Sequence, residues 1–422
     1  MGSTLTPIQL TQDRASLTVS DYIHRINDYI TDPVQYLINT IGGAQYNENK
    51  HLMHLPDHTN NAEYNTLDVY GSGGHKQLFE SHIAKLFSKR YCTFMITGVA
   101  AQTIACKLYC IQYKRDIAAW HHKSHLQIHE QNSYSELYNI HNILIGQCST
   151  QIPSVNDIRS IIELPLEKRP SVIVMELPNR ELGCVTYSYD ELVEISELCH
   201  SNGIALHCDG ARIWEIESYY KQYNNKSYSD IAALFDSIYI SFYKGLHGVA
   251  GAMLLSNNQQ FISDANVWVR RAGGNPITLI YDTIDCERGF NENIGTFDVK
   301  YKKMLSIARA VQESTQQYKL YNQRSIIQFE PTVPTCCQAM IHIYGANNEQ
   351  LNSIRDTIQH KLNIRVFNRV RQYTSVNNEM NGVDDRIHYC QEWSVYSGNI
   401  NIDNKCYVDA YTMLAEEISK LQ

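Results

Sequence analysis

Two short polar runs, each following an apolar stretch, carry side chains that can do chemistry. Asp209 and Arg212 lie in the run from His207 to Arg212, which follows the apolar residues 204–206. Lys244 lies in the run from Ser241 to Gly245, which follows the stretch 238–240. An amine can act as a nucleophile, and a fixed carboxylate can hold a proton on a bound group. The pair therefore predicts a site that combines covalent and electrostatic chemistry.

Each apolar stretch predicts a buried strand that delivers its polar residues at its carboxyl end. Ligands bind at that edge in open α/β sheets. Alone, Lys244 reads as a surface charge and Asp209-Gly210 as a turn, but together they match what pyridoxal phosphate needs: an amine for a Schiff base and a carboxylate for its pyridine nitrogen. The nearby glycines Gly245, Gly248 and Gly251 also let the backbone approach a bulky group.

The elements that must position these residues alternate between strands and helices. Gly71 to Gly74 open a predicted helix, and Thr97-Gly98-Val99 separate a strand from a second helix that runs through Cys110. A capping box at Ser188 to Glu191 begins another helix, which Asn202-Gly203 end. Predicted strands cover residues 93–96, 172–175 and 204–208. This alternation predicts a mostly parallel sheet with right-handed crossovers.

The chain is long enough for more than one hydrophobic core, since it has 422 residues. We expect a helical arm over residues 1–67, a large α/β domain over 68–317 and a smaller α+β domain over 318–422. A long helical stretch over 291–317 is expected to leave the large domain. The last segment mixes predicted strands with predicted helices, which cover 339–343, 393–395, 349–361 and 408–421.

Composition narrows the classes of function. The net charge of −8 argues against a surface for nucleic acid or anionic membranes. We find no secretory signal and no run of about 18 apolar residues, so no membrane span is expected. The twelve cysteines are scattered without a C-x-x-C pair, which favours buried thiols in a reducing, cytoplasmic compartment. His121, His122, His125 and His129 cluster without matching ligands, so no metal site is expected.

The order of the motifs resembles the threonine aldolase / aromatic amino acid β-eliminating lyase family, which consists of pyridoxal-phosphate enzymes of the aspartate aminotransferase fold (fold type I). The resemblance runs from about Tyr70 to Gly274, and residues 176–183 and 268–274 are similar to the bacterial low-specificity threonine aldolases. The matching motifs are Tyr70-Gly71, Thr97-Gly98-Val99, His125 to Glu130, His207 to Arg212 and Tyr243-Lys244-Gly245.

The resemblance implies a role for each motif. Lys244 is expected to carry the cofactor as a Schiff base and to move protons, and Asp209 to pair with the pyridinium nitrogen. Arg212 is expected near the phenolic oxygen of the cofactor. His125 is expected to stack on the pyridine face and to be the base near the substrate β-hydroxyl. The backbone N–H groups of Thr97-Gly98-Val99 and the helix dipole suit the phosphate.

The sequence also departs from the family. Tyr243 stands where a Ser usually precedes the Schiff-base Lys, and we do not find the usual Asp-x-Arg-Ser-Asp-Thr pattern near the amino terminus. His388 occupies the usual position of the Arg that binds the substrate carboxylate, while Arg386 lies two positions away and is the candidate substrate-binding residue. His cannot replace a bidentate Arg without loss. Substrate identity is therefore less closely determined than cofactor identity.

The expected function is cleavage of a β-hydroxy-α-amino acid to glycine and an aldehyde, as in low-specificity L-threonine aldolases. Two alternatives stay open: a pyridoxal-phosphate enzyme that performs β-elimination or another amino-acid transformation, and a non-catalytic protein that keeps the fold for binding. A Rossmann dehydrogenase is disfavoured, because no G-x-G-x-x-G follows the first strand. The resemblance implies a small amino-acid substrate and a homodimer or homotetramer.

Overall fold

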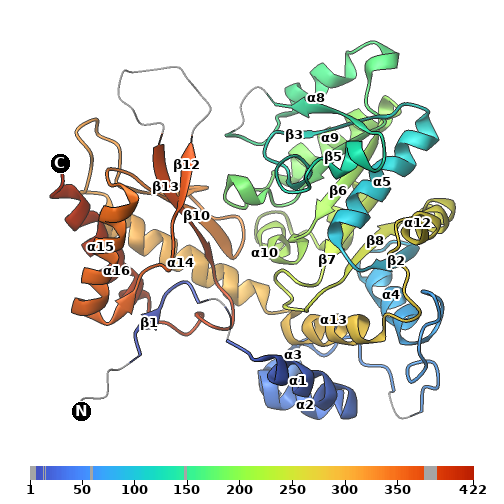
Figure 1. Cartoon of the computed structure of the whole chain (residues 1–422), viewed down its shortest axis with the longest axis horizontal. Coiled ribbons are helices and arrows are strands. Elements are labelled where there is room, and N and C mark those ends of the chain that lie inside the picture. Colours follow the sequence, from blue (N-terminus) through green and yellow to red (C-terminus); the bar gives the residue numbers. More distant parts are fainter. Residues whose placement is uncertain (1–5, 13, 15, 58–59, 147–149, 375–386) are drawn as a thin grey trace. The chain divides into compact units, whose positions relative to one another are not determined.

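The computed structural model describes residues 6–12, 14, 16–57, 60–146, 150–374 and 387–422. The chain forms two compact units (Figure 1). The large unit comprises Leu17–Pro178 and Thr186–Phe297. The small unit comprises Asn179–Val185, Asp298–Gln422 and the described residues up to Ser16.

The large unit contains a seven-stranded mixed sheet in the order β2-β8-β7-β6-β5-β3-β4. Strands β3 to β7 run parallel to one another, and β8 lies antiparallel to both β2 and β7. The predicted α/β class with a mostly parallel mixed sheet is thereby confirmed. The strands are β2 Tyr91–Met95, β3 Ile117–His121, β4 His141–Ile145, β5 Val172–Glu176, β6 Ala205–Gly210, β7 Ser237–Ser241 and β8 Ala252–Ser256.

The sheet register determines which residues share an edge and a face. Glu176 is paired with Asp209, and Asp209 with Tyr239, on the parallel strands β5, β6 and β7. Because side chains alternate along a strand, Asp209 lies on the same face of β6 as Ala205, four residues earlier. Ala205 and Tyr239 belong to the apolar cluster that packs against α5. Asp209 is thus carried by the α5 face, at the carboxyl end of its strand.

Helix α5, Gly98–Tyr113, packs across most of the sheet and beside α12, Gln259–Arg271. Nearly every residue of its middle turns is buried, which fits the apolar composition that predicted it. Helix α9, Tyr189–Ser201, begins with the predicted capping box. Asn202 is its C-cap, and Gly203, which has φ +64°, follows. The other helices of the unit are α1 Val19–Thr31, α2 Pro33–Ile41, α3 Gly43–Asn49, α4 Gly74–Leu86, α6 His125–Ile128, α7 Ser133–Glu136, α8 Val155–Ile162, α10 Ile213–Asn224, α11 Tyr228–Ala233, α13 Ile280–Asn293 and the 3-10 turn Leu166–Lys168.

The small unit is built on a four-stranded antiparallel sheet in the order β12-β13-β10-β9. Its helices are α14 Phe297–Thr315, whose first residue belongs to the large unit, α15 Asn348–Leu362 and α16 Asn404–Ser419. A short parallel pair joins β1, Ile8–Gln9, to β11, Ile364–Arg365. The remaining elements are β9 Ile327–Glu330, β10 Gln338–Ile343, β12 Arg371–Thr374, β13 Ile387–Ser394 and the 3-10 turn Arg180–Leu182.

The units do not coincide with the predicted segments 1–67, 68–317 and 318–422. Helices α1 and α2 pack on α13 of the large unit and α3 packs on α2, while residues 8–9 pair with β11 of the small unit. Most of the long helical stretch predicted over 291–317 is helix α14. Its first residues belong to the end of α13, and the two helices are separated around Gly295, whose φ of +80° interrupts helical geometry.

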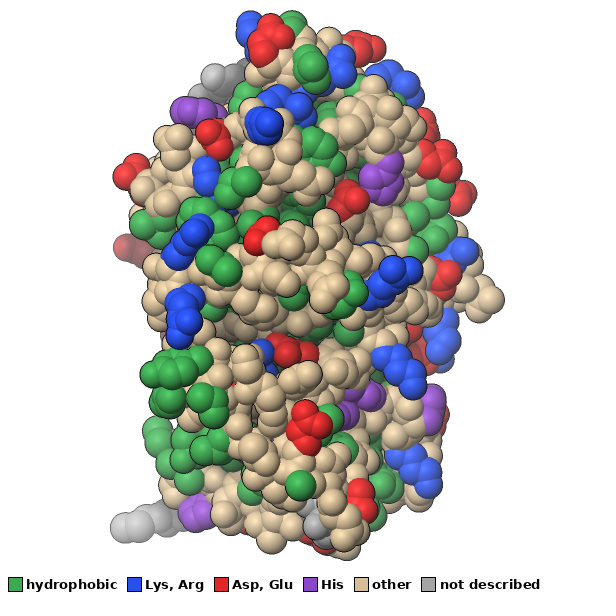
Figure 2. All heavy atoms as spheres, turned by 90° about the vertical axis from the view of Figure 1, so that its right-hand side faces the viewer, with side chains coloured by type: hydrophobic (Ala, Val, Ile, Leu, Met, Phe, Trp, Pro, Cys, Tyr) green, Lys and Arg blue, Asp and Glu red, His purple; other side chains and the backbone are tan. Residues whose placement is uncertain are grey.

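The surface carries charges of both signs. On the face shown in Figure 2, Lys and Arg side chains are interspersed with Asp and Glu. Within the described part of the chain, each helix is too short or too polar to cross a membrane.

Candidate active site

The carboxyl edge of the parallel strands gathers the predicted site residues of the large unit. His125 follows β3, Asp209 lies near the end of β6, and Lys244 follows β7. Residues 97–99 form the N-cap and first turn of α5, which follows β2 at the same edge, because β2 and β7 are both antiparallel to β8. Asp209 and His125 lie close enough to shift each other's pKa. The structure therefore brings together residues separated by more than a hundred positions in sequence.

Asp209 is a buried carboxylate that several cations face. Its side chain is 2% exposed, and its Oδ1 accepts the Ala211 N–H over 3.1 Å. Burial raises the pKa of Asp209, while the charges of His125, Lys244 and Arg212 and this hydrogen bond favour the ionised form. Such an anion suits a bound group that carries a protonated ring nitrogen.

The half-buried Lys244 is placed by unusually close backbone packing. A Cβ on the next residue, Gly245, would lie 2.6 Å from Oε1 of the buried Glu215. A Cβ on Gly210, beside Asp209, would lie 2.6 Å from the backbone oxygen of Tyr239. Glycine is therefore required at Gly210, where a side chain would push the strand backbones apart, whereas a side chain at Gly245 would displace the Glu215 carboxylate.

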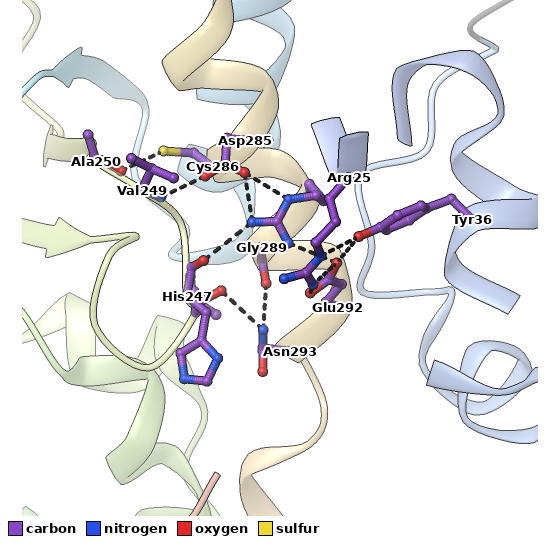
Figure 3. Close-up of polar contacts among 12 residues, drawn as sticks. Arg25, Tyr36, His247, Val249, Ala250, Asp285, Cys286, Gly289, Glu292 and Asn293 are labelled. Atoms are coloured by element: carbon purple, nitrogen blue, oxygen red, sulfur yellow. Dashed lines mark hydrogen bonds and ion pairs between the residues drawn. The ribbon is translucent and has the colours of Figure 1, made fainter. Parts of the chain in front are cut away.

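Helix α13 holds the loop that follows Lys244 (Figure 3). The Val249 N–H donates to Asp285 Oδ2 over 2.6 Å, and Arg288 Nη2 donates to the His247 carbonyl over 3.3 Å. Asn293 Nδ2 donates to the Leu246 carbonyl over 3.0 Å. The Cys286 thiol also donates to the Ala250 carbonyl over 3.0 Å, so the loop backbone is bonded at four points to side chains of one helix (Figure 3).

The loop-binding side chains of α13 are themselves part of a buried ion network. Arg288 is fully buried and pairs with Asp285 at 2.7 Å and with Glu292 at 2.8 Å. Glu292 also pairs with Arg25 of α1 at 2.8 Å and accepts the Tyr36 hydroxyl over 2.6 Å (Figure 3). Each of these charges has an oppositely charged partner, which offsets the free-energy cost of removing the charges from water. The network fixes α13, and hence the loop, against the helices of the N-terminal segment.

His125 is oriented by two carboxylates. Its backbone N–H donates to Glu176 Oε2 over 3.0 Å. Its ring Nδ1 forms a hydrogen bond of 3.0 Å with Oε1 of the buried Glu130. Burial alone would lower the pKa of His125, but the hydrogen bond to Glu130 and the charges of Asp209, Glu130 and Glu176 raise it above its ordinary value. With Nδ1–H bound to an ionised Glu130, Nε2 is the ring atom that can exchange a proton.

The start of α5 is shaped by two tyrosines. Thr97 is the N-cap, and its hydroxyl accepts the Ala100 N–H over 3.2 Å. The Gly98 N–H donates to the Tyr243 hydroxyl oxygen, which lies 3.3 Å from the Tyr239 hydroxyl. A Cβ on Gly98 would lie 1.9 Å from that Tyr239 oxygen. The predicted phosphate-binding end of the helix therefore has its first amide bonded to Tyr243.

The remaining sequence predictions have different outcomes. Arg212 is the half-buried N-cap of α10, where its charge acts on Asp209. Val99 is exposed in the first turn of α5. Arg386 lies outside the described residues, so its substrate-binding role stays a prediction. His388 is buried in the small unit, with its Nε2 2.7 Å from His342 Nδ1.

Several site residues were not found from the sequence. Asp285, Arg288 and Glu292 recur at helical spacing among other polar residues, a pattern typical of a solvated helix face. Tyr239 alternates with isoleucines and reads as an ordinary core residue. Glu130 and Glu176 lie in sequence runs that match the family, 125–130 and 176–183, but the sequence assigned neither of them a role.

The described residues contain no group of three or more His, Cys, Asp or Glu arranged to hold a metal ion. The eleven cysteines in the described ranges are free thiols.

Known proteins are similar to this chain in sequence and in fold. The family model described as "Beta-eliminating lyase" matches residues 56–278. The low specificity L-threonine aldolase of Saccharomyces cerevisiae is 27% identical over 209 residues, which cover 49% of this chain and 52% of that protein. The low-specificity L-threonine aldolase of Eremothecium gossypii is also 27% identical, over 50% of its length. The chain thus spans about half the length of the curated relatives it matches.

Solved structures extend the likeness over the whole chain. A crystal structure described as a putative L-allo-threonine aldolase from Listeria monocytogenes is 27% identical, with a TM-score of 0.76 and coverage of 98% of this chain and 96% of that one. A putative aromatic amino acid beta-eliminating lyase/threonine aldolase from Exiguobacterium is 24% identical, with a TM-score of 0.74 and coverage of 98% and 97%. The second likeness concerns the fold alone.

Proposed function

The chain belongs to the beta-eliminating lyase family, and we propose that it is a pyridoxal-phosphate-dependent lyase that cleaves a β-hydroxy-α-amino acid to glycine and an aldehyde. One observation carries the proposal. A half-buried amine, a buried carboxylate and an imidazole converge at one sheet edge, at Lys244, Asp209 and His125. The likeness to threonine aldolases names the substrate class.

The residues at this edge fit pyridoxal phosphate in their chemistry. Lys244 offers an amine, Asp209 a buried anion, Arg212 a cation, and α5 the positive end of a helix of sixteen residues. When bound, the cofactor supplies an aldehyde that condenses with amines and a pyridine ring that withdraws electrons from the substrate α-carbon.

Lys244 and Asp209 divide the work of covalent and electrostatic catalysis. Lys244 would hold the cofactor through its amine and would then carry a proton, because an amine on a loop fixed to α13 returns to one position. Asp209 holds a proton at the pyridine nitrogen, and nearby cations favour the ionised form that this task requires.

His125 provides the base for the bond-breaking step. Its Nε2 accepts the proton of the substrate β-hydroxyl, and loss of that proton drives cleavage of the Cα–Cβ bond. Glu130 and Glu176 keep the ring in place and stabilise the imidazolium that forms. The side chain is 33% exposed, so a substrate can reach it.

Borohydride trapping tests the cofactor and its attachment. Mass spectrometry of the reduced, digested protein is expected to show the pyridoxyl group on Lys244. Lys244→Ala should lose the adduct, whereas Lys221→Ala, which alters an exposed residue of α10, should keep it. An adduct on another residue, or none, contradicts the proposal and leaves the non-catalytic alternative.

The reaction is tested by incubating the purified protein with L-threonine and other β-hydroxy amino acids. Glycine and an aldehyde are expected. Ammonia and a keto acid in their place would show the alternative, β-elimination. If the pyridoxyl group is found on Lys244 but neither pair of products forms, the protein binds the cofactor and acts on other substrates.

We also propose a homodimer or homotetramer in a reducing, cytoplasmic compartment. Similarity to the family supports the assembly, and the buried free thiols of the described chain support the compartment. Light scattering on the protein as it elutes from a size-exclusion column measures the mass of the assembly. A monomer at micromolar concentration contradicts the proposed oligomer.

A further inference from the structure

Gln102 is a buried amide on α5 that contacts the carboxylate beside His125. It is 2% exposed, and its Nε2 donates to Glu130 Oε1 over 3.3 Å. The same carboxylate oxygen forms the 3.0 Å hydrogen bond with His125 Nδ1. One oxygen of Glu130 therefore has two nitrogen partners, one from the proposed base and one from Gln102.

Only one end of the Gln102 amide has a partner. Its Oε1 is buried and has no hydrogen-bond partner within the described part of the chain. A buried, unpaired carbonyl oxygen lowers stability, so a strong contact elsewhere must offset it. Hydrogen bonds to a charged acceptor are the stronger kind. Turned over, the amide would place its oxygen against Glu130 Oε1, so its orientation indicates that Glu130 is ionised.

The other side-chain contact of Glu130 is of a different kind. Ser133 Oγ donates to Glu130 Oε2 over 3.3 Å. A hydroxyl group can donate or accept, so Ser133 can bond this carboxyl group in either protonation state. The N–H groups of Gln102 can only donate, so they favour the carboxylate over the carboxylic acid. Gln102 is therefore the contact that distinguishes the two states.

The pair of His125 and Glu130 can hold its second proton in two ways. An imidazolium can face a carboxylate, or a neutral imidazole can face a carboxylic acid. Burial raises the pKa of Glu130, which favours the neutral pair, and the N–H of Gln102 opposes this by stabilising the carboxylate. Without that donor the neutral pair gains population, and the second proton is released only at higher pH.

We propose that Gln102 is a positioning residue that keeps Glu130 ionised and thereby sets the pH at which His125 becomes a base. Its part in the reaction rests on the proposed function, because it requires His125 to accept the substrate proton. Its effect on the titration of His125 does not. Other titratable groups face the pair and stay the same in every comparison below: Cys106, His129, Glu176, Asp209, Tyr239 and Tyr243.

Gln102→Met tests the proposal, because it keeps an unbranched side chain and removes both the donor and the unpaired oxygen. The titration of His125 is followed by NMR of the full-length protein with isotope-labelled histidine, and His125→Asn identifies the resonance. We expect the midpoint to rise by about half to one pH unit, the difference between hydrogen bonds to charged and neutral acceptors. The acid side of the kcat/KM profile should move in the same direction.

A double-mutant comparison shows whether Gln102 acts through Glu130. In a Glu130→Gln background, Gln102→Met should leave the midpoint unchanged, because no carboxylate remains to be kept ionised. Thr103→Val is the matched control on α5. Thr103 is equally buried, but its hydroxyl donates to the Val99 carbonyl over 2.7 Å, so the midpoint should stay in place. Thermal melts confirm that each variant folds.

The outcomes separate this inference from the proposed function. An unchanged or lower midpoint in Gln102→Met overturns the inference, as does an equal rise in the Glu130→Gln background, and lyase activity would then still support the proposed function. A raised midpoint in a protein that forms neither glycine nor an aldehyde supports the effect of Gln102 on His125 and overturns the proposed reaction.

Discussion

Val249, five residues beyond Lys244, donates its N–H to Oδ2 of the buried Asp285 over 2.6 Å. Asp285 is held in turn by Arg288, which also binds the His247 carbonyl (Figure 3). A backbone loop bonded to a rigid helix keeps the preceding amine within a narrow range of positions, which is what covalent catalysis needs.

Asp285→Ala is therefore expected to loosen the loop. We predict faster hydrogen exchange at the amides of residues 246–250 and a fall in kcat of at least about tenfold, because small misplacements of reacting groups are costly. Asp282→Asn, a half-buried position one turn earlier on α13, is the control and should change neither quantity. Unaltered exchange at Val249 would contradict the positioning role.

Asp209→Ala should impair chemistry more than cofactor affinity. In the proposed mechanism the buried carboxylate would keep the cofactor ring charged, whereas Lys244 would retain the cofactor. We expect kcat to fall by about a hundredfold or more, the range for losing one preorganised electrostatic partner, with the cofactor absorbance retained. A full kcat in a cofactor-loaded variant would remove Asp209 from the mechanism.

The acid side of the pH profile should depend on Glu130. His125 acts as a base only when neutral, and nearby carboxylates raise its pKa, so kcat/KM should rise as the pH rises through that raised value. Glu130→Gln removes one of these charges, lowers the pKa of His125 and shifts the rise to lower pH. Ser133→Ala, which loses a 3.3 Å bond to Glu130, should leave the profile in place.

Gly98→Ala should destabilise the protein through Tyr239. The added Cβ would lie 1.9 Å from the Tyr239 hydroxyl, so the ring must shift in a packed core, at about 1–3 kcal/mol in the free energy of unfolding. The same change in a Tyr239→Leu background should cost less, because the clash is gone. Equal costs in urea unfolding of the two backgrounds would show that the sites do not interact.

Glu287 should make the protein sensitive to acid. Its buried carboxylate contacts His54 at 2.7 Å and His75 at 2.8 Å and accepts the hydroxyls of Tyr29 and Tyr64. These histidines hold the pKa of Glu287 well below its ordinary value. A depressed carboxylate pKa contributes stability that is present above the unfolded value of about 4.3 and is lost as the pH falls below it.

Glu287→Gln tests this assignment. The free energy of unfolding at neutral pH should fall by about 3–5 kcal/mol, the range for breaking a buried ion pair, and its decline below about pH 4.3 should be shallower than in the wild type. Asp298→Asn, which breaks an exposed pair with Lys302 at 2.6 Å, should change it by less than about 1 kcal/mol. A parallel decline in Glu287→Gln and wild type would contradict the linkage.

The sequence alone determined the class of fold and placed Asp209 and Lys244 at one edge of the predicted sheet. Apolar runs of strand length ending in Asp209 and Lys244 predict strands of one parallel sheet, and parallel strands present their carboxyl ends at one edge. The capping box at Ser188 marks the start of α9 for a local reason, since its hydrogen bonds join residues three apart. Local patterns of this kind are readable without the fold.

Only the tertiary structure decided which polar residues support that chemistry. Arg288 and Glu292 have the composition of an exposed helix face, yet α13 is buried, because partners from α1 and the loop after Lys244 satisfy its charges. Likewise, Tyr239 meets Gly98 across more than a hundred residues, and no local pattern encodes that approach. Burial and long-range pairing arise from the packing of whole elements, so they become visible only when the chain is folded.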